Sequence, residues 1–145
     1  MRDRKLLEAA AKAAGLRWSK DPEIAHDGLW ITAPAHKIKT YWNPLSDDGD
    51  ALLLAVTLGI AVVPYPIYAS DKHSVVAKQY RSKDILRKKN PTEVVEVYGT
   101  NPAAATRRAI VGCAAAIGIE KTNILLNKEI DNAVKGGCAG PLQEE

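Results

Sequence analysis

The sequence contains no phenylalanine, and aromatic residues make up only 6% of its 145 residues. A folded core must therefore be built from Ala, Val, Leu and Ile, which the 46% hydrophobic content supplies. A chain of this length buries roughly two thirds of the surface that its unfolded form exposes, so it needs no disulfide or structural metal. The composition indicates one ordinary globular domain and excludes a disordered or fibrous chain.

Groups that carry chemistry are also scarce. The two cysteines, Cys113 and Cys138, lack the paired spacing of a zinc site or redox motif, and we expect free thiols. The three histidines, His26, His36 and His73, stand at no ligand-like or triad-like interval from a cysteine or carboxylate. No glycine-rich phosphate loop or nucleophile elbow is present. We therefore expect a non-enzymatic protein with no metal or cofactor; a small hydrolase would need a pocket that joins residues far apart in the sequence.

One apolar run is a candidate for a membrane span, and we expect it to be too short. The best candidate, residues 51–68, is broken by Pro64 and Pro66, which leaves about 13 residues where a membrane helix needs about 20. The first fifteen residues lack the apolar core and cleavage site of a secretory signal. We expect neither membrane insertion nor secretion.

The first third of the chain predicts a helix and a hairpin. Apolar residues at helical spacing follow Asp3, a candidate cap, and Gly15 is a natural stop. Short alternating segments at 29–33 and 36–42 are typical of two strands joined by a turn.

The stretch "WNPLSDDGDALLLAVTLGI" at 42–60 places three aspartates before an apolar run. Asp47, Asp48 and Asp50 suit the positive end of a helix dipole. A calcium loop would need oxygen ligands at alternate positions and a closing Glu, which do not follow Asp50. The pattern therefore favours a helix start over a metal site, and Gly59 is expected to end the helix.

The remaining pattern predicts three strands and two helices, at 60–68, 74–80, 93–99, 102–117 and 120–134. Pro102 suits a first helical position, and Gly118 is expected to end that helix. The last helix places Leu126, Ile130 and Val134 on one face.

This order of elements predicts a single α+β domain over residues 1–135, with a mostly antiparallel sheet of about four to five strands packed by three to four helices. Residues 119–135 form an extra C-terminal helix in this prediction. Residues 136–145 form a flexible tail rich in glycine and acidic residues.

Three blocks carry a resemblance: "DRKLLEAAAKAAGL" (3–16), "WNPLSDDGDALLLAVTLGI" (42–60) and "AAATRRAIVGCAAAIG" (103–118). They resemble a family of small proteins of unassigned activity encoded by tailed bacteriophages and prophages. The middle block is the specific one, because composition alone does not produce W-N-P-L followed by D-D-G-D-A-L. The resemblance covers about a third of the chain and implies a compact α/β sandwich in the cytoplasm of a bacterial host. The resemblance assigns no catalytic residues to this chain.

The departures from that family pattern remove charges. Family members carry Arg or Lys where this chain has Leu53 and Thr57, and Arg and Glu where it has Gly112 and Ala116. Each pair is four residues apart and shares one face of its helix. These four residues are therefore candidates for an apolar interface, which we expect the C-terminal helix to cover by folding back; a homodimer or a partner protein is the alternative.

Basic charge is concentrated between residues 72 and 89, where the only acidic residue is Asp84. Such a segment can bind an acidic protein surface or phosphates, or can be a solvated strand edge and loop. The candidate partner-binding residues are Lys72, Lys78, Arg81, Lys83, Arg87, Lys88 and Lys89.

Arg107 falls on the core-facing side of its helix and near the positive helix end, where a cation needs a carboxylate. Asp47, Asp48 or Asp50 can supply it if the two helix starts lie side by side. The alternative is an anion site formed by Arg107 and Arg108.

The sequence as a whole predicts a phage or prophage accessory protein that binds a host protein with an acidic surface. An inhibitor of a bacterial defence system, of the anti-CRISPR kind, fits this description. The alternative is a nucleic-acid-binding accessory protein that uses residues 72–89.

Overall fold

The computed structural model describes residues 2–19, 27–32, 38–65, 74–80, 92–97 and 101–136. Within these ranges the helices are α1 (Asp3–Ala13), α2 (Asp48–Leu58) and α4 (Pro102–Gly136). The strands are β1 (Arg17–Trp18), β2 (Leu29–Thr32), β3 (Lys39–Trp42), β4 (Ile60–Tyr65), β5 (Ser74–Gln79) and β6 (Thr92–Val97). The predicted α+β class is confirmed.

The strands form two antiparallel sheets of three strands each, in place of the single larger sheet that the sequence predicted. Sheet A has the order β1-β2-β3, and it contains the expected hairpin, with Leu29 paired to Trp42. Sheet B has the order β4-β5-β6. Pro64 lies in β4 at the edge of sheet B, which is where a strand tolerates a residue without an N–H group.

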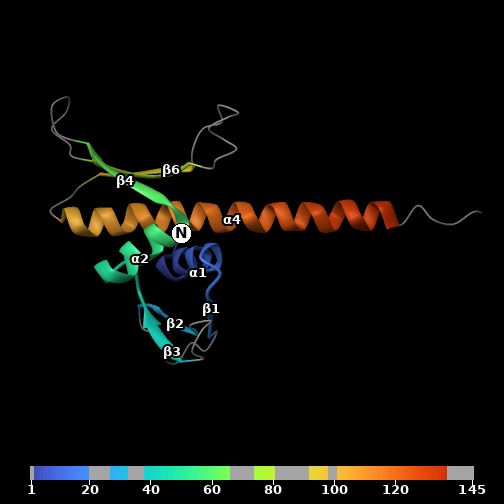
Figure 1. The fold of residues 1–145 in the computed structure, drawn as a ribbon, viewed down its shortest axis with the longest axis horizontal. Helices are drawn as coiled ribbons and strands as arrows, with labels where there is room; N and C mark the ends of the chain where they lie inside the picture. Colours follow the sequence, from blue (N-terminus) through green and yellow to red (C-terminus); the bar gives the residue numbers. More distant parts are fainter. Residues whose placement is uncertain are drawn as a thin grey trace, which may run out of the picture.

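The long helix α4 runs through the molecule and organises the layers (Figure 1). Sheet B packs on one side of α4, whereas α1 and α2 pack on the other side, with sheet A beyond them. The core between these layers is aliphatic, as the composition requires. Its fully buried side chains include Leu7, Leu29, Val75, Val111 and Ile117.

Three of the predicted helix ends are found in the structure, whereas those at Asp3 and Gly118 are not. Gly15 and Gly59 follow α1 and α2 with positive φ angles of 72° and 64°, a conformation that glycine adopts at little cost. The side chain of Asn101 caps α4, since its Oδ1 accepts from the N–H of Ala104 at 3.0 Å. Asp3 does not cap α1; it is the first helical residue, and the cap position belongs to Arg2 without a side-chain hydrogen bond.

The prediction that Gly118 ends a helix is wrong, because α4 continues through it to Gly136. Gly118 is buried where α4 crosses α1, and a Cβ atom there would collide with the carbonyl oxygen of Ala9. The Nζ of Lys121 donates to the Ala13 carbonyl at 2.9 Å at the same crossing. Glycine therefore serves the close approach of two helices and not the end of one.

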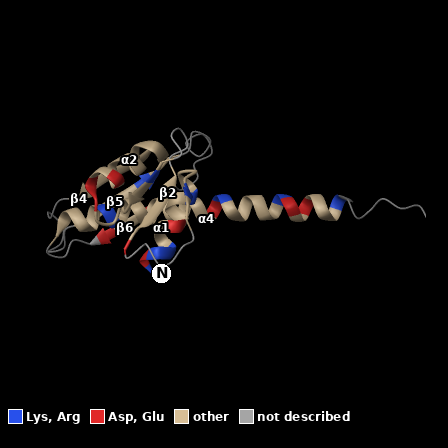
Figure 2. Ribbon diagram, turned by 90° about the horizontal axis from the view of Figure 1, so that it is seen from below, with Lys and Arg blue, Asp and Glu red and all other residues tan. Residues whose placement is uncertain are grey.

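Beyond the crossing, residues 119–135 of α4 leave the rest of the described structure (Figures 1 and 2). Every side chain in this segment is exposed except Thr122, which is half-buried. The expectation that this segment folds back over the charge-depleted helix faces is therefore wrong. We call residues 119–135 the helical extension.

Among the described residues, one helix, Pro102–Lys135, is long and apolar enough by length and composition to cross a membrane. A helix in the core of a protein passes the same test, and residues 105–118 contain the buried side chains of α4. The helical extension carries six charged side chains, which Figure 2 shows as blue and red bands. The length and composition of this helix are therefore weak evidence that it spans a membrane.

Candidate functional site: an apolar face on α2

The start of α2 is held by hydrogen bonds within the W-N-P-L-S-D-D-G-D block. The buried side chain of Asn43 donates to the Asp27 carbonyl at 2.9 Å and accepts from the N–H of Leu45 at 3.2 Å. Asp47 caps the helix, because its Oδ1 accepts from the N–H of Asp50 at 2.8 Å. The predicted helix start is confirmed, and the described residues contain no group of three or more His, Cys, Asp or Glu placed to hold a metal ion.

Asp50 closes this network from the other side. Its Oδ2 accepts from the N–H of Asn43 at 2.8 Å. Partial burial raises the pKa of Asp50, the hydrogen bond from Asn43 lowers it, and the nearby charge of Asp47 raises it; the net direction is upward. The surroundings of Asp50 in the folded chain therefore disfavour its ionised form.

Arg107 joins α4 to the loop before α2. Its NH1 group lies 2.6 Å from Oδ1 of Asp48, and its Nε donates to the Leu45 carbonyl at 2.9 Å. The structure thus contains the expected ion pair between the two helix starts. Arg108 pairs instead with Asp3 of α1, at 3.2 Å. The two arginines point to different carboxylates and do not converge on one anion site.

Apolar residues surround the whole circumference of α2, yet only one side of the helix is buried. Ala51, Leu54 and Ala55 face the core. On the other side Leu52 and Leu53 are each 64% exposed, and Val56 is 70% exposed. A helix that is apolar all round is normally covered on every side. The exposed side of α2 therefore lacks a cover within the described residues.

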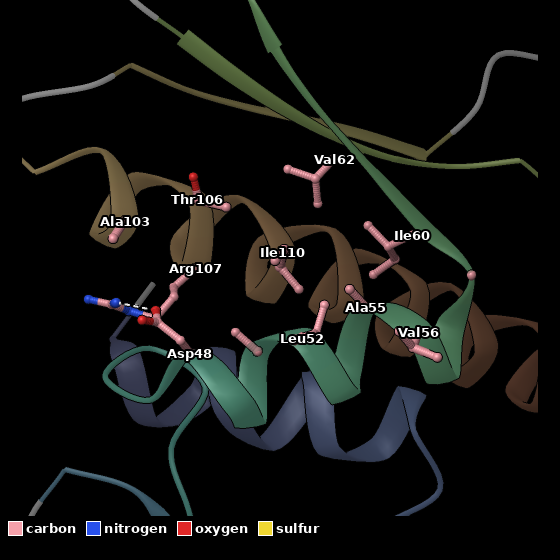
Figure 3. A pocket seen from close by; sticks show the side chains of 12 residues that line it. Asp48, Leu52, Ala55, Val56, Ile60, Val62, Ala103, Thr106, Arg107 and Ile110 are labelled. Atoms are coloured by element: carbon pink, nitrogen blue, oxygen red, sulfur yellow. Dashed lines mark hydrogen bonds and ion pairs between the residues drawn. The ribbon is translucent and has the colours of Figure 1, made fainter.

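A hollow lies on each side of this exposed ridge. The larger one is a groove of about 670 Å³ between α2, β4 and the first turns of α4, shown in Figure 3. Leu52, Val56 and Val62 line it, and the Arg107–Asp48 ion pair closes one end. The smaller hollow, about 240 Å³, lies between α2 and sheet A and includes Leu53, Thr57 and Tyr41.

We call the ridge and its flanks the α2 face. It consists of Leu52, Leu53 and Val56 of α2 with Val62 of β4 and Tyr41 of β3.

The four charge-depleted positions do not behave alike. Leu53 and Thr57 lie on the exposed side of α2, and the Thr57 hydroxyl donates to the Leu53 carbonyl at 2.7 Å. Gly112 instead faces β6, since a Cβ there would lie 3.1 Å from Cγ1 of Val94. Ala116 is half-buried. Among the described residues nothing covers the outer face of α2, whereas sheet B covers α4 at Gly112.

Of the seven basic residues predicted to bind a partner, only Lys78 lies within the described ranges. Its Nζ is 3.6 Å from a carboxylate oxygen of Glu93 on the neighbouring strand. Burial by itself lowers the pKa of Lys78, but Tyr65, Tyr80 and Glu93 outweigh it and the net direction is upward. Lys78 is thus a charged side chain with a partner inside sheet B; the role of the other six residues stays a prediction.

The Cys113 thiol is buried under β6, where its Sγ donates to the Thr92 carbonyl at 3.6 Å. Burial raises the pKa of this thiol to about 11, against a smaller lowering by a backbone hydrogen bond at Gln79. A thiol with this pKa is protonated at neutral pH and is a poor nucleophile. Cys138 lies outside the described residues.

Comparisons with protein-family models, with curated proteins and with solved structures gave no match to this chain. The α2 face is therefore characterised by its own geometry. One sequence signal could have revealed it: the run from Ala51 to Leu58 shows no 3,4 spacing, so it has no polar side to turn toward water.

Proposed function

We propose that this chain acts by binding another protein, and that the α2 face is where the partner docks. The observation that carries the proposal is the combination of an all-round apolar helix with three largely exposed aliphatic side chains, Leu52, Leu53 and Val56. Contiguous exposed apolar side chains on a small protein mark interaction surfaces. The groove between two helices and a strand suits an amphipathic helix of the partner, with apolar side chains directed into it.

The energetics support a protein-sized partner. The exposed parts of Leu52, Leu53 and Val56 amount to roughly 300 Å² of apolar surface, worth on the order of 7 kcal/mol gross at about 25 cal/mol per Å². Association costs a comparable amount in lost translational and rotational freedom. Binding must therefore engage the ridge and both hollows together, which an apolar helix can do and a small polar ligand cannot.

The setting of the proposal comes from the resemblance of three sequence blocks to tailed-phage and prophage proteins. On that ground we propose a phage accessory role in the bacterial cytoplasm, in which binding blocks a host protein such as a component of a defence system. The nucleic-acid alternative rests on residues 72–89, and Lys78, its one described member, pairs with Glu93. The α2 face is thus the better supported docking surface.

The proposal is tested by site-specific photo-crosslinking in bacterial cells. A photoreactive residue at position 52, in the groove, is expected to capture a protein that the same residue at Lys5, exposed on α1, does not capture. The captured protein is then purified and its affinity measured. Leu52→Glu should weaken binding by at least about 100-fold, because it places a charge in an apolar contact.

The matched control is Leu125→Glu in the helical extension, where the leucine is 58% exposed. It should leave binding within about threefold. Equal affinities for Leu52→Glu and the unmodified chain would refute the α2 face. Nucleic-acid binding that falls log-linearly with salt and is lost when Arg87, Lys88 and Lys89 are changed to Glu would favour the alternative.

A further inference from the structure

The helical extension carries a second exposed apolar surface, with a different pattern from the α2 face. Its residues Ile119, Asn123, Leu126, Ile130 and Ala133 follow alternating spacings of four and three. This is the seven-residue repeat with which one helix packs along another. We call these five residues the extension stripe. Lys121, Lys128 and Lys135 repeat every seven residues on the opposite side, which also carries Ile124, 43% exposed.

The stripe needs a packing partner that the described residues do not supply. Ile119, Leu126 and Ile130 are 43%, 55% and 54% exposed. Most of the stability of a helix in a protein comes from packing of its apolar side, and within the described residues nothing packs on this side of the extension.

The direction from which a partner helix can approach is limited by sheet B. Gly112 precedes Ile119 by one seven-residue repeat and so lies on the same side of α4. That side is occupied at Gly112 by Val94 of β6. A helix running parallel to α4 along the stripe would continue into β6. A helix running antiparallel to α4 would reach it only with its last residues.

We propose that the occupant is a second copy of this chain, whose helical extension packs antiparallel along the stripe about a two-fold axis. In the register that we infer, Ile119 lies against Ile130 of the second copy, and Asn123 lies against Leu126 of the second copy. Ala116 then lies against Ala133 of the second copy. In this register Gly136 of the second copy lies opposite Cys113, so the second helix reaches the level of β6 only with its last residues.

The area fits a reversible dimer. Side chains of the stripe, with Val134 beside it, expose roughly 500 Å² per copy, so that pairing buries on the order of 1,000 Å² in total, at the small end of specific interfaces. We therefore expect dissociation in the micromolar range.

The stripe is also independent of the α2 face. Ile110 lines the groove and is sixteen residues before Leu126, which places the two about 160° apart around the helix.

Sedimentation equilibrium over a range of protein concentrations tests the dimer. Leu126→Glu is expected to raise the dissociation constant at least about 100-fold, since the interface would bury an unpaired carboxylate. Leu125→Glu is the matched control, because Leu125 is 58% exposed, adjacent in sequence and outside the stripe. It should change the constant by less than about threefold. Circular dichroism shows whether both variants keep their helix. A chain that is monomeric at every concentration, or equal effects of the two substitutions, would overturn the proposal.

Orientation is tested with Ile119→Cys and Ile130→Cys, each alone in a Cys138→Ser background; Cys113 is buried and stays in place. Antiparallel pairing brings position 119 of one copy to position 130 of the other. Oxidation should therefore crosslink a mixture of the two variants and neither variant alone. Crosslinking of each variant alone would show parallel pairing and overturn the inferred register.

Discussion

Replacement of Gly118 by alanine tests the helix crossing at the centre of the molecule. Helix propensity alone predicts that Gly→Ala in a helix interior stabilises the protein by about 1 kcal/mol. In this structure the added methyl group would collide with the Ala9 carbonyl oxygen and would lie 3.3 Å from the Ala13 nitrogen. Both atoms belong to the backbone of α1, so no side-chain rotation can relieve the collision. The whole helix α1 must move.

The cost of that movement can be sized from the packing of α1. Its residues Leu7, Ala10, Ala11 and Ala13 are each at most 3% exposed, so a shift disturbs every one of these contacts. Overpacking of this kind costs about 3 to 5 kcal/mol, at or above the usual range because backbone is involved. After the propensity gain, we expect Gly118→Ala to lower the free energy of unfolding by about 2 to 4 kcal/mol.

Urea unfolding followed by circular dichroism, at one fixed protein concentration, measures this change. A midpoint lower by about 1 to 2 M is expected at unchanged slope. Gly112→Ala in the same helix is the control: its Cβ would meet Cγ1 of Val94 at 3.1 Å, and a side chain can give way. It should change stability by less than about 1 kcal/mol. If Gly118→Ala is as stable as the unmodified chain, the close crossing of α1 and α4 is refuted.

Three further predictions follow from the site. Arg107→Ala and Asp48→Ala should each lower the free energy of unfolding by about 1 to 3 kcal/mol, because the first leaves the Leu45 carbonyl without its donor and the second leaves the 15% exposed Arg107 side chain without its carboxylate; unchanged stability of either variant would contradict this. Native Cys113 should react with a thiol reagent only on unfolding, since burial raises its pKa to about 11; prompt labelling of Cys113 in the folded chain, in a Cys138→Ser background, would contradict this. Because the pKa of Asp50 is raised, the folded state favours its protonated form, so its stabilising contribution is present at low pH and lost as the pH rises through the folded-state pKa. The stability of the unmodified chain relative to Asp50→Asn should therefore increase on acidification, and a difference independent of pH would contradict the shift.

Local patterns predicted the elements well, because their signals are short-range. The turn residues Gly15 and Gly59, the start at Asn101 and Pro102, and the aspartates before α2 all act within a few residues of themselves. Strand patterns located five of the six described strands for the same reason, and missed the two-residue strand β1 (Arg17–Trp18). The partner of Arg107 could be anticipated too, since a cation on a buried helix side requires a carboxylate.

The errors came from long-range contacts. The sequence pattern predicts a helix end at Gly118, because glycine is common at helix ends. In the structure Gly118 lies inside α4, because only glycine allows the close contact with Ala9, which is over a hundred positions away in the sequence. Once Gly118 is helical, the following segment is carried away from the domain and cannot fold back. The division into two sheets likewise depends on α4 lying between them, which no local pattern contains.

The continuity of α4 through Gly118 has a consequence for multivalent binding. The helical extension has no joint, so its 17 residues form a rod of about 26 Å that holds a fixed direction relative to the domain. In the proposed dimer this rod sets a constant spacing and angle between the two α2 faces. Both faces can then bind one target only if that target repeats its binding site at the same spacing. Avidity for such a target would rise steeply, whereas the affinity for a target with a single site would not change.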